Sequence, residues 1–216
     1  MKRHIIIIFA ALGLLSCTRP GADGFTDREI SLIREADSIM RVLTIEDSLD
    51  LVVLRTSSRE LTSEMLLSDE FKRLSGLMTA TVTHPSQDGV GIAGPQVGLN
   101  RRVVAVQRFD KEGEPFEVYP NIRIVWAADS LESGPEGCLS VPDRRENVLR
   151  SREIVIEYSD IASIENLAAT MSSRELRHHF RTSPLPMVRD TIRGFTAVIF
   201  QHECDHLDGV LYIDRL

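Results

Sequence analysis

Residues 190–209 read DTIRGFTAVIFQHECDHLDG and combine regularly spaced apolar residues with two histidines. Its apolar and histidine side chains recur at the spacing i, i+3, i+4, i+7 and i+11, which is the spacing of one helical face. The residues in this pattern are Phe195, Val198, Ile199, His202 and His206. We predict a helix that starts at the cap residue Asp190 and ends at Gly209, with both histidines on its buried face.

The same helix contains the pentad His202-Glu203-Cys204-Asp205-His206, an HExxH motif. Histidines four residues apart can bind one metal ion, and the adjacent glutamate can reach a metal-bound water. The alternative interpretation is a pair of buried structural histidines beside a surface glutamate. Cys204 lies two residues from each histidine and points to another side of the helix, so we expect it to be a packed thiol.

A catalytic metal site requires a third protein ligand. Ten residues follow His206, which leaves little chain for a downstream ligand, so we expect the third ligand upstream. The best candidate is Cys138, in the segment EGCLS at residues 136–140, because a thiolate binds Zn²⁺ or Fe²⁺ strongly. The alternative for Cys138 is a small buried apolar side chain, which is how most free cysteines behave.

Short β-branched runs precede this helix at residues 102–106, 116–119, 122–126 and 154–158. Their close spacing, followed by a helix near the end of the chain, predicts an α+β fold with antiparallel pairing rather than a doubly wound sheet. An additional helix is expected after the cap residue Ser68.

Three segments together resemble the peptide deformylases: GVGIAGPQ at residues 89–96, EGCLS at 136–140 and QHECDH at 201–206. The resemblance covers about residues 51–216 and implies antiparallel sheets packed around a central C-terminal helix that carries HExxH. Residues 209–215 resemble the last strand of the family. Gly94 stands where the family usually has alanine, so we expect a looser loop there.

The resemblance implies one divalent metal ion held by Cys138, His202 and His206, with water as the fourth ligand. Glu203 then acts as general base and general acid on a metal-bound water nucleophile. The side-chain amide of Gln96 and the backbone N–H of Leu139 stabilise the oxygen of the tetrahedral intermediate. Fe²⁺ is the usual ion of the family, and Zn²⁺ is plausible for a protein outside the cytoplasm.

The implied substrate is an N-formyl-methionyl peptide. Four apolar residues match the family's pocket for the methionine side chain: Val90, Phe195, Val198 and Ile199. Gly91 and Gly137 match positions whose backbone groups pair with an extended peptide, and Arg145 matches an arginine near the substrate. Ordinary core packing is the alternative for the apolar residues, and a solvated surface position is the alternative for Arg145.

In the family, the connection that corresponds to residues 161–190 is short. We therefore expect that this chain carries an insertion near residues 161–190. Its basic residues are Arg174, Arg177, His178, His179, Arg181 and Arg189. A solvated face is the favoured interpretation of this cluster, and attraction of a peptide carboxylate is the alternative.

Residues 1–17 carry a basic start, the apolar run 5–12 and the tetrapeptide Leu14-Leu15-Ser16-Cys17. This pattern is too short to span a bilayer and resembles the signal of bacterial lipoproteins, so we expect export and lipidation of Cys17. A plain cleaved signal or an uncleaved anchor is the alternative. Residues 18–50 then form a tether and a helical extension, in which Thr26 and Glu29 have the spacing of a capping box. Ile33, Ala36, Met40 and Leu43 recur on one face of that expected helix.

The net charge of −7, without a long Lys/Arg run, argues against a nucleic-acid partner. A deformylase normally acts on nascent chains, and an exported enzyme cannot. Two alternatives to deformylation therefore stay open: an exported metallopeptidase or amidase acting on other N-acyl peptides, and a non-catalytic lipoprotein that binds peptides. The first predicts an open cleft and activity on unformylated, N-blocked peptides. The second predicts metal-free protein or bound peptide without turnover.

Overall fold

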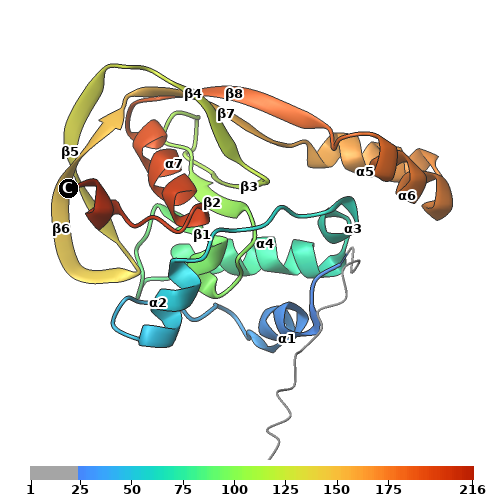
Figure 1. Ribbon diagram of the computed structural model, residues 1–216, viewed down its shortest axis with the longest axis horizontal. Coiled ribbons are helices and arrows are strands. Elements are labelled where there is room, and N and C mark those ends of the chain that lie inside the picture. Colours follow the sequence, from blue (N-terminus) through green and yellow to red (C-terminus); the bar gives the residue numbers. More distant parts are fainter. Residues whose placement is uncertain (1–23) are drawn as a thin grey trace, which may run out of the picture.

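The computed structural model describes residues 24–216, so the proposed signal and Cys17 lie outside the described residues. Three antiparallel sheets and one central helix organise the molecule, as Figure 1 shows. The sheets have the orders β1-β2-β3, β4-β7-β8 and β5-β6. The predicted α+β class with antiparallel pairing is confirmed.

The strands are β1 (Gly91–Ala93), β2 (Val103–Gln107), β3 (Phe116–Pro120), β4 (Arg123–Ala127), β5 (Leu131–Cys138), β6 (Val141–Ser151), β7 (Glu153–Ser159) and β8 (Met187–Arg193). The α-helices are α1 (Asp27–Glu35), α2 (Ser48–Leu54), α3 (Ser63–Leu66), α4 (Asp69–Val82), α5 (Ile161–Thr170), α6 (Ser173–Thr182) and α7 (Gly194–Leu207). Two short 3₁₀ helices are η1 (Gly94–Val97) and η2 (Tyr212–Arg215).

Two helix starts follow the caps predicted from sequence. Thr26 accepts a hydrogen bond from the Glu29 N–H, and the Glu29 carboxylate accepts one from the Thr26 N–H, which completes the capping box of α1. Ser68 caps α4 by accepting from the Phe71 N–H. However, α1 ends at Glu35, so the expected extension of that helix to Leu43 is wrong.

The segment after α1 is extended because groups distant in sequence bind its backbone. The N–H of Met40 donates to the Thr81 hydroxyl of α4, and the N–H of Leu43 donates to the Gln96 carbonyl. Met40 and Leu43 are buried all the same. The apolar periodicity therefore marked a packed surface and did not mark a continuous helix.

Helix α7 packs at the centre of the molecule against β1 and β2 and against the β4-β7-β8 sheet. Its buried residues Ala197, Ile199, Phe200, Cys204 and Leu207 share one core cluster with the strands. The helix starts at Gly194 rather than at Asp190. Asp190 belongs to β8, where it pairs with Ile156, and its carboxylate accepts a hydrogen bond from Arg108.

The β5-β6 hairpin was missed from sequence because most of its side chains are exposed and many are charged. Strand β5 ends beside α7, so its last residue, Cys138, reaches the helix that carries HExxH. The expected strand at residues 209–215 is also wrong. That segment contains η2, whose start is fixed when the Leu211 N–H donates to the Asp214 carboxylate.

Helices α5 and α6 fill the segment in which we expected an insertion, and they extend beyond the sheets at one end of the molecule (Figure 1). Ile164 of α5 is buried in the cluster that also contains Leu66 and Phe71, and Phe180 of α6 packs against it. Within residues 24–216, no helix is both long and apolar enough to cross a membrane.

Gly94 does not loosen its loop, contrary to the expectation from sequence. A Cβ at this position would lie 2.6 Å from the Arg101 carbonyl oxygen and 2.7 Å from the Leu99 carbonyl oxygen. The backbone of residues 99–101 therefore occupies the space that an alanine methyl would need.

We predict that Gly94→Ala lowers the free energy of unfolding by about 1–3 kcal/mol, because backbone atoms must move to admit the methyl group. The control is Gly76→Ala in α4, where nothing lies within 4 Å of the added Cβ. Alanine there should raise the free energy of unfolding by about 0.5–1 kcal/mol, since glycine is the poorer helix former. Denaturant unfolding of both variants measures the contrast. Equal stability of the two variants would contradict the close packing at Gly94.

Candidate metal centre and active site

Three side chains with metal-binding donors converge where β5 meets α7. The donor atoms of Cys138, His202 and His206 all lie within 4.8 Å of one another. The Cys138 sulfur is 3.2 Å from His206 Nε2. One thiol and two imidazoles form a donor set that suits Zn²⁺ or Fe²⁺, so the residues present fit a single divalent ion.

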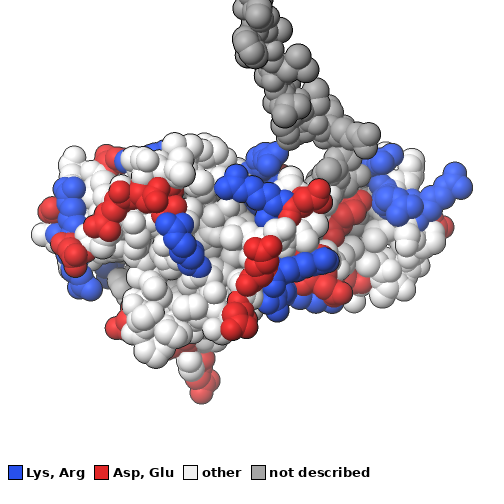
Figure 2. Space-filling view, turned by 90° about the horizontal axis from the view of Figure 1, so that it is seen from below, with Lys and Arg blue, Asp and Glu red and all other residues white. Residues whose placement is uncertain are grey.

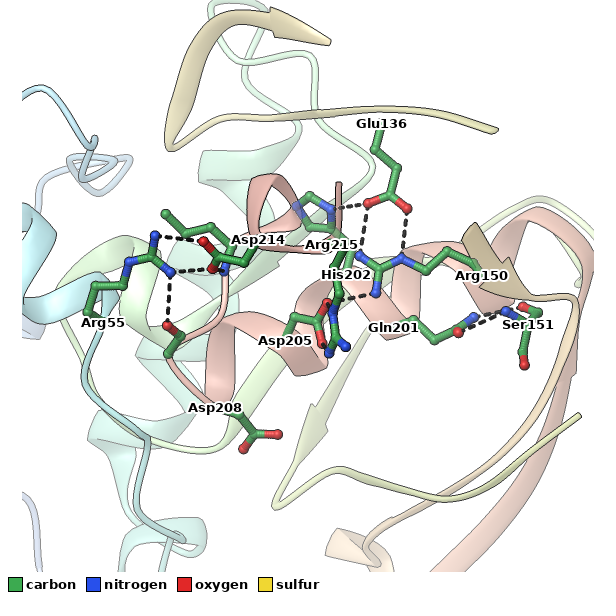
Figure 3. Close-up of polar contacts among 12 residues, drawn as sticks. Arg55, Glu136, Arg150, Ser151, Gln201, His202, Asp205, Asp208, Asp214 and Arg215 are labelled. Atoms are coloured by element: carbon green, nitrogen blue, oxygen red, sulfur yellow. Dashed lines mark hydrogen bonds and ion pairs between the residues drawn. The ribbon is translucent and has the colours of Figure 1, made fainter. Parts of the chain in front are cut away.

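A buried carboxylate orients the first histidine. Glu136 Oε2 lies 2.9 Å from His202 Nδ1, so the ring turns its Nε2 toward Cys138. Arg150 in turn donates to both oxygens of Glu136, at 2.8 and 3.0 Å. Figure 3 shows these contacts side by side.

Asp205 extends this network on the same helix. It accepts a hydrogen bond of 2.7 Å from Arg150 and one of 2.6 Å from Arg215. We call Glu136, Arg150, Asp205 and Arg215 the support network. Sequence reasoning missed it, although Glu136 lies in the EGCLS segment and Asp205 in the HExxH motif. The spacing of those motifs carries no sign that Arg150 and Arg215 come together there.

The protonation of the site follows from burial and from this network. Burial alone would raise the pKa of Glu136, but hydrogen bonds from His202 and Arg150 outweigh it and lower that pKa to about 2. Glu136 is therefore ionised near neutral pH and accepts a hydrogen bond from His202 Nδ1–H. Burial also lowers the pKa of His206 well below its usual value, which favours the neutral imidazole that a metal requires.

Cys204 is buried on another side of α7, in the apolar cluster with Phe200 and Leu207. Burial raises the pKa of its thiol to about 12. A protonated thiol of this kind is a poor metal ligand, and Cys138 and Cys204 are both free. Cys204 is thus the packed thiol that the helical spacing predicts.

Glu203 is buried against β1 beside the metal ligands. A Cβ on Gly91 would lie 2.4 Å from Glu203 Oε1, so glycine at this position lets the carboxylate approach the strand. Within the described part of the chain, Glu203 Oε2 has no hydrogen-bond partner. Burial raises the pKa of Glu203 to about 7, which suits a group that takes up and returns a proton near neutral pH.

Gln96 is held so that its amide donor faces the metal ligands. Its Oε1 accepts a hydrogen bond of 2.8 Å from the Ala93 N–H. The Nε2 therefore points the other way, 3.7 Å from the Cys138 sulfur and 3.2 Å from the Ser140 hydroxyl. The 3₁₀ helix η1, with Pro95 in its first turn, fixes the backbone that carries this amide.

A cavity of about 680 Å³ opens onto these groups. The residues that we expected to bind substrate all line it: Val90, Gly91, Gly137, Arg145, Phe195, Val198 and Ile199. Gln96, Cys138, Leu139, His202 and Glu203 line it as well, whereas the buried His206 lies behind the wall. Phe195 is half exposed and packs on Phe109 with ring centroids 5.4 Å apart, which places it at the rim.

The lining residues that were not expected from sequence include four polar ones outside the three motifs: Gln87, Asp88, Asp143 and Arg144. They come from the α4-β1 loop and from β6. Asp88 and Asp143 have positive φ values of 47° and 57°. Aspartate tolerates this left-handed conformation better than most residues, and that was the available signal of a turn at each position.

Comparison with known proteins places the chain. The family model for polypeptide deformylase matches residues 39–180 and 186–216. The peptide deformylase of Leptospira biflexa is 31% identical over 171 residues, covering 76% of this chain and 82% of that protein. Peptide deformylase 1 of Vibrio vulnificus is 32% identical over 183 residues, covering 83% of this chain and 87% of that protein. The Met-Ala-Ser-bound structure of a class I type b peptide deformylase from Acinetobacter baumannii matches with a TM-score of 0.64 and 28% identity. The match covers 82% of this chain and 98% of that protein. The chain belongs to the polypeptide deformylase family.

Proposed function

We propose that the protein is a metal-dependent hydrolase that removes the formyl group from N-formyl-methionyl peptides. The observation that carries the proposal is the convergence of Cys138, His202 and His206 within 4.8 Å, with Glu203 and Gln96 lining the same cavity. Membership of the family supports this activity over a general peptidase or a binding protein.

The roles of the chain's own residues follow from their positions. Cys138, His202 and His206 would hold a divalent ion, and its chemistry there would be to activate a water and to act as a Lewis acid toward the formyl carbonyl. Glu203 takes the proton of the attacking water and returns it to the leaving amine, because its carboxylate is buried with one oxygen free. Gln96 Nε2 and the Leu139 N–H donate to the carbonyl oxygen as it gains charge.

The cavity supports a methionyl peptide in an extended conformation. Val90, Val198 and Ile199 give the cavity an apolar wall that fits an unbranched side chain. Strand β1 lies at the edge of its sheet, so the backbone of Gly91 can pair with an added strand. Gly137 faces the same cavity from β5, and Arg145 lies over it at the mouth.

Release of formate from formyl-Met-Ala-Ser tests the activity. We expect turnover by full-length protein loaded anaerobically with Fe²⁺ or Zn²⁺, complete loss after chelation, and recovery when the ion is returned. Acetyl-Met-Ala-Ser is the control substrate, since its extra methyl group separates deformylation from general N-acyl hydrolysis. Protein that holds one ion per chain and releases no formate would overturn the proposal.

We also propose that the protein is exported and anchored by a lipid on Cys17, because the basic start, the short apolar run and the cysteine follow one another in residues 1–17. In that setting Zn²⁺ is the favoured ion, since Fe²⁺ oxidises readily. Labelling with palmitate, with Cys17→Ser as the control, tests the anchor. Recovery of unlabelled protein in the cytoplasm would exclude export and the anchor. Metal analysis of protein isolated from its own compartment tests the ion, and iron in that protein would exclude zinc.

A further inference from the structure

Helix α6 carries positive side chains along one exposed face. Arg174, Arg177, His178 and Arg181 occupy positions i, i+3, i+4 and i+7 of the helix, so they form a single stripe, and all four are exposed. We call these four residues the α6 cationic face. The acidic residue of the helix, Glu175, is occupied by the N–H and hydroxyl of Ser172 in the capping box.

Packing on an adjoining side of α6 fixes the direction of this stripe. Phe180 packs against the main hydrophobic cluster, and Leu185 beyond the helix packs there too. Ile164 of the neighbouring α5 is fully buried in the same cluster. The α6 cationic face is therefore held outward by packing, and it does not depend on a mobile loop.

The deformylation chemistry does not use this face. None of its residues lines the cavity that holds Cys138 and Glu203. Within residues 24–216, Arg174 and Arg177 form no ion pair with an acidic side chain. Arg174 and His178 instead border a separate surface hollow. Its other lining residues are Thr170, Met171, Glu175, His179 and Thr182, and the carboxylate of Glu175 is taken up by Ser172. Guanidinium, imidazole and hydroxyl groups are suitable donors for a phosphate group.

The end of the molecule at which α6 lies differs in charge from the rest of the protein. The chain as a whole has a net charge of −7, whereas α6 carries three arginines and one glutamate. Figure 2 shows blue side chains predominating over red at its right-hand end, the end at which α5 and α6 lie in Figure 1. Such a separation of charge orients a protein on a surface of opposite sign.

We propose that the α6 cationic face binds the anionic headgroups of a phospholipid bilayer and so orients the protein on the membrane. A bilayer is favoured over other polyanions because residues 1–17 place an apolar run and a lipidation-type cysteine in the same chain. A lipid chain and a basic patch act together in peripheral membrane binding. The proposal does not depend on the deformylase activity.

Hydrogen exchange of the full-length, metal-loaded protein on vesicles tests this contact. We expect the amides of residues 173–182 to exchange more slowly on phosphatidylcholine vesicles that contain phosphatidylglycerol than on phosphatidylcholine alone, and to lose this protection at high salt. Each arginine near an anionic surface contributes about 5-fold to binding, so replacing three should weaken the contact roughly 100-fold. The triple variant Arg174→Gln, Arg177→Gln, Arg181→Gln should therefore show no protection.

A second triple variant keeps the change in net charge equal. This variant removes three exposed arginines that lie outside α6, by the substitutions Arg123→Gln, Arg152→Gln and Arg193→Gln. Protection of residues 173–182 should survive in it. Denaturant unfolding of both variants checks that they fold. Equal protection on both vesicle types, or protection that persists in the α6 variant, would overturn the proposal. Protection by single-stranded DNA or polyglutamate but not by vesicles would overturn it in favour of an acidic macromolecule.

Discussion

Glu203→Gln should lower kcat/KM for formate release by about 10²–10⁴-fold, because the amide cannot accept the proton of the attacking water. The side chain keeps its size and its place against Gly91, so the metal ligands should stay where they are. Steady-state assays with formyl-Met-Ala-Ser measure the effect. Elemental analysis should still find one metal ion per chain.

Glu165→Gln is a matched control for this substitution, since Glu165 is an exposed glutamate of α5 outside the cavity. It should leave kcat/KM unchanged. If Glu203→Gln retained more than about a tenth of the activity with its metal bound, the proton would have to travel through another group, and the role assigned to Glu203 would be wrong.

Glu136→Gln should weaken metal binding by about 10–100-fold and destabilise the fold by about 3–5 kcal/mol. The cause of the first effect is loss of the anion that turns His202 Nε2 toward Cys138. The fold is destabilised because the buried guanidinium of Arg150 then keeps only Asp205 as a charged partner. Competition with a chelator and denaturant unfolding measure the two effects separately.

The control for Glu136 is its direct neighbour across the hairpin, Glu146. Glu146 is exposed and pairs with Arg144, a surface contact worth about 0–1 kcal/mol. Glu146→Gln should therefore alter neither metal affinity nor stability by a comparable amount. Unchanged metal affinity in Glu136→Gln would show that the negative charge of Glu136 is not needed to hold His202 for the metal.

Features that depend on neighbouring residues could be predicted from the sequence. The capping box at Thr26 and the cap at Ser68 are decided within four residues, and both helices start where these caps place them. The α+β class also followed from local patterns, because short β-branched runs with close links favour antiparallel pairing. The convergence of Cys138 with the HExxH histidines, which the sequence suggested through motif chemistry, is present in the structure.

Features that depend on distant residues could not be predicted. Asp190 looked like a helix cap, yet its backbone pairs with Ile156 and its carboxylate with Arg108. The β5-β6 hairpin has exposed charged residues on its strands, so it shows no apolar alternation. Nothing near Gly94 in the sequence indicates that the carbonyl oxygens of Leu99 and Arg101 fold back against it.

The support network shows the same limit within the site. Glu136 and Asp205 were visible as residues of two motifs, but their function depends on Arg150, which lies 14 residues beyond Glu136 on the partner strand. The residue that orients a ligand is chosen by three-dimensional proximity. A sequence motif identifies the metal ligands because they occur at fixed spacing in the chain. The residues that hydrogen-bond to these ligands have no fixed spacing, so a motif does not identify them.

The central position of α7 affects the order in which the protein can form. Ala93, Val104, Val106, Ile154 and Ile156 are all buried in the cluster that α7 completes. A ribosome makes these strands before it makes Gly194, so during synthesis their apolar faces have no helix to cover them. Until the residues of α7 have been made, the growing chain therefore exposes apolar strand surface that is prone to aggregate, and this part of the core can close only when synthesis is almost finished.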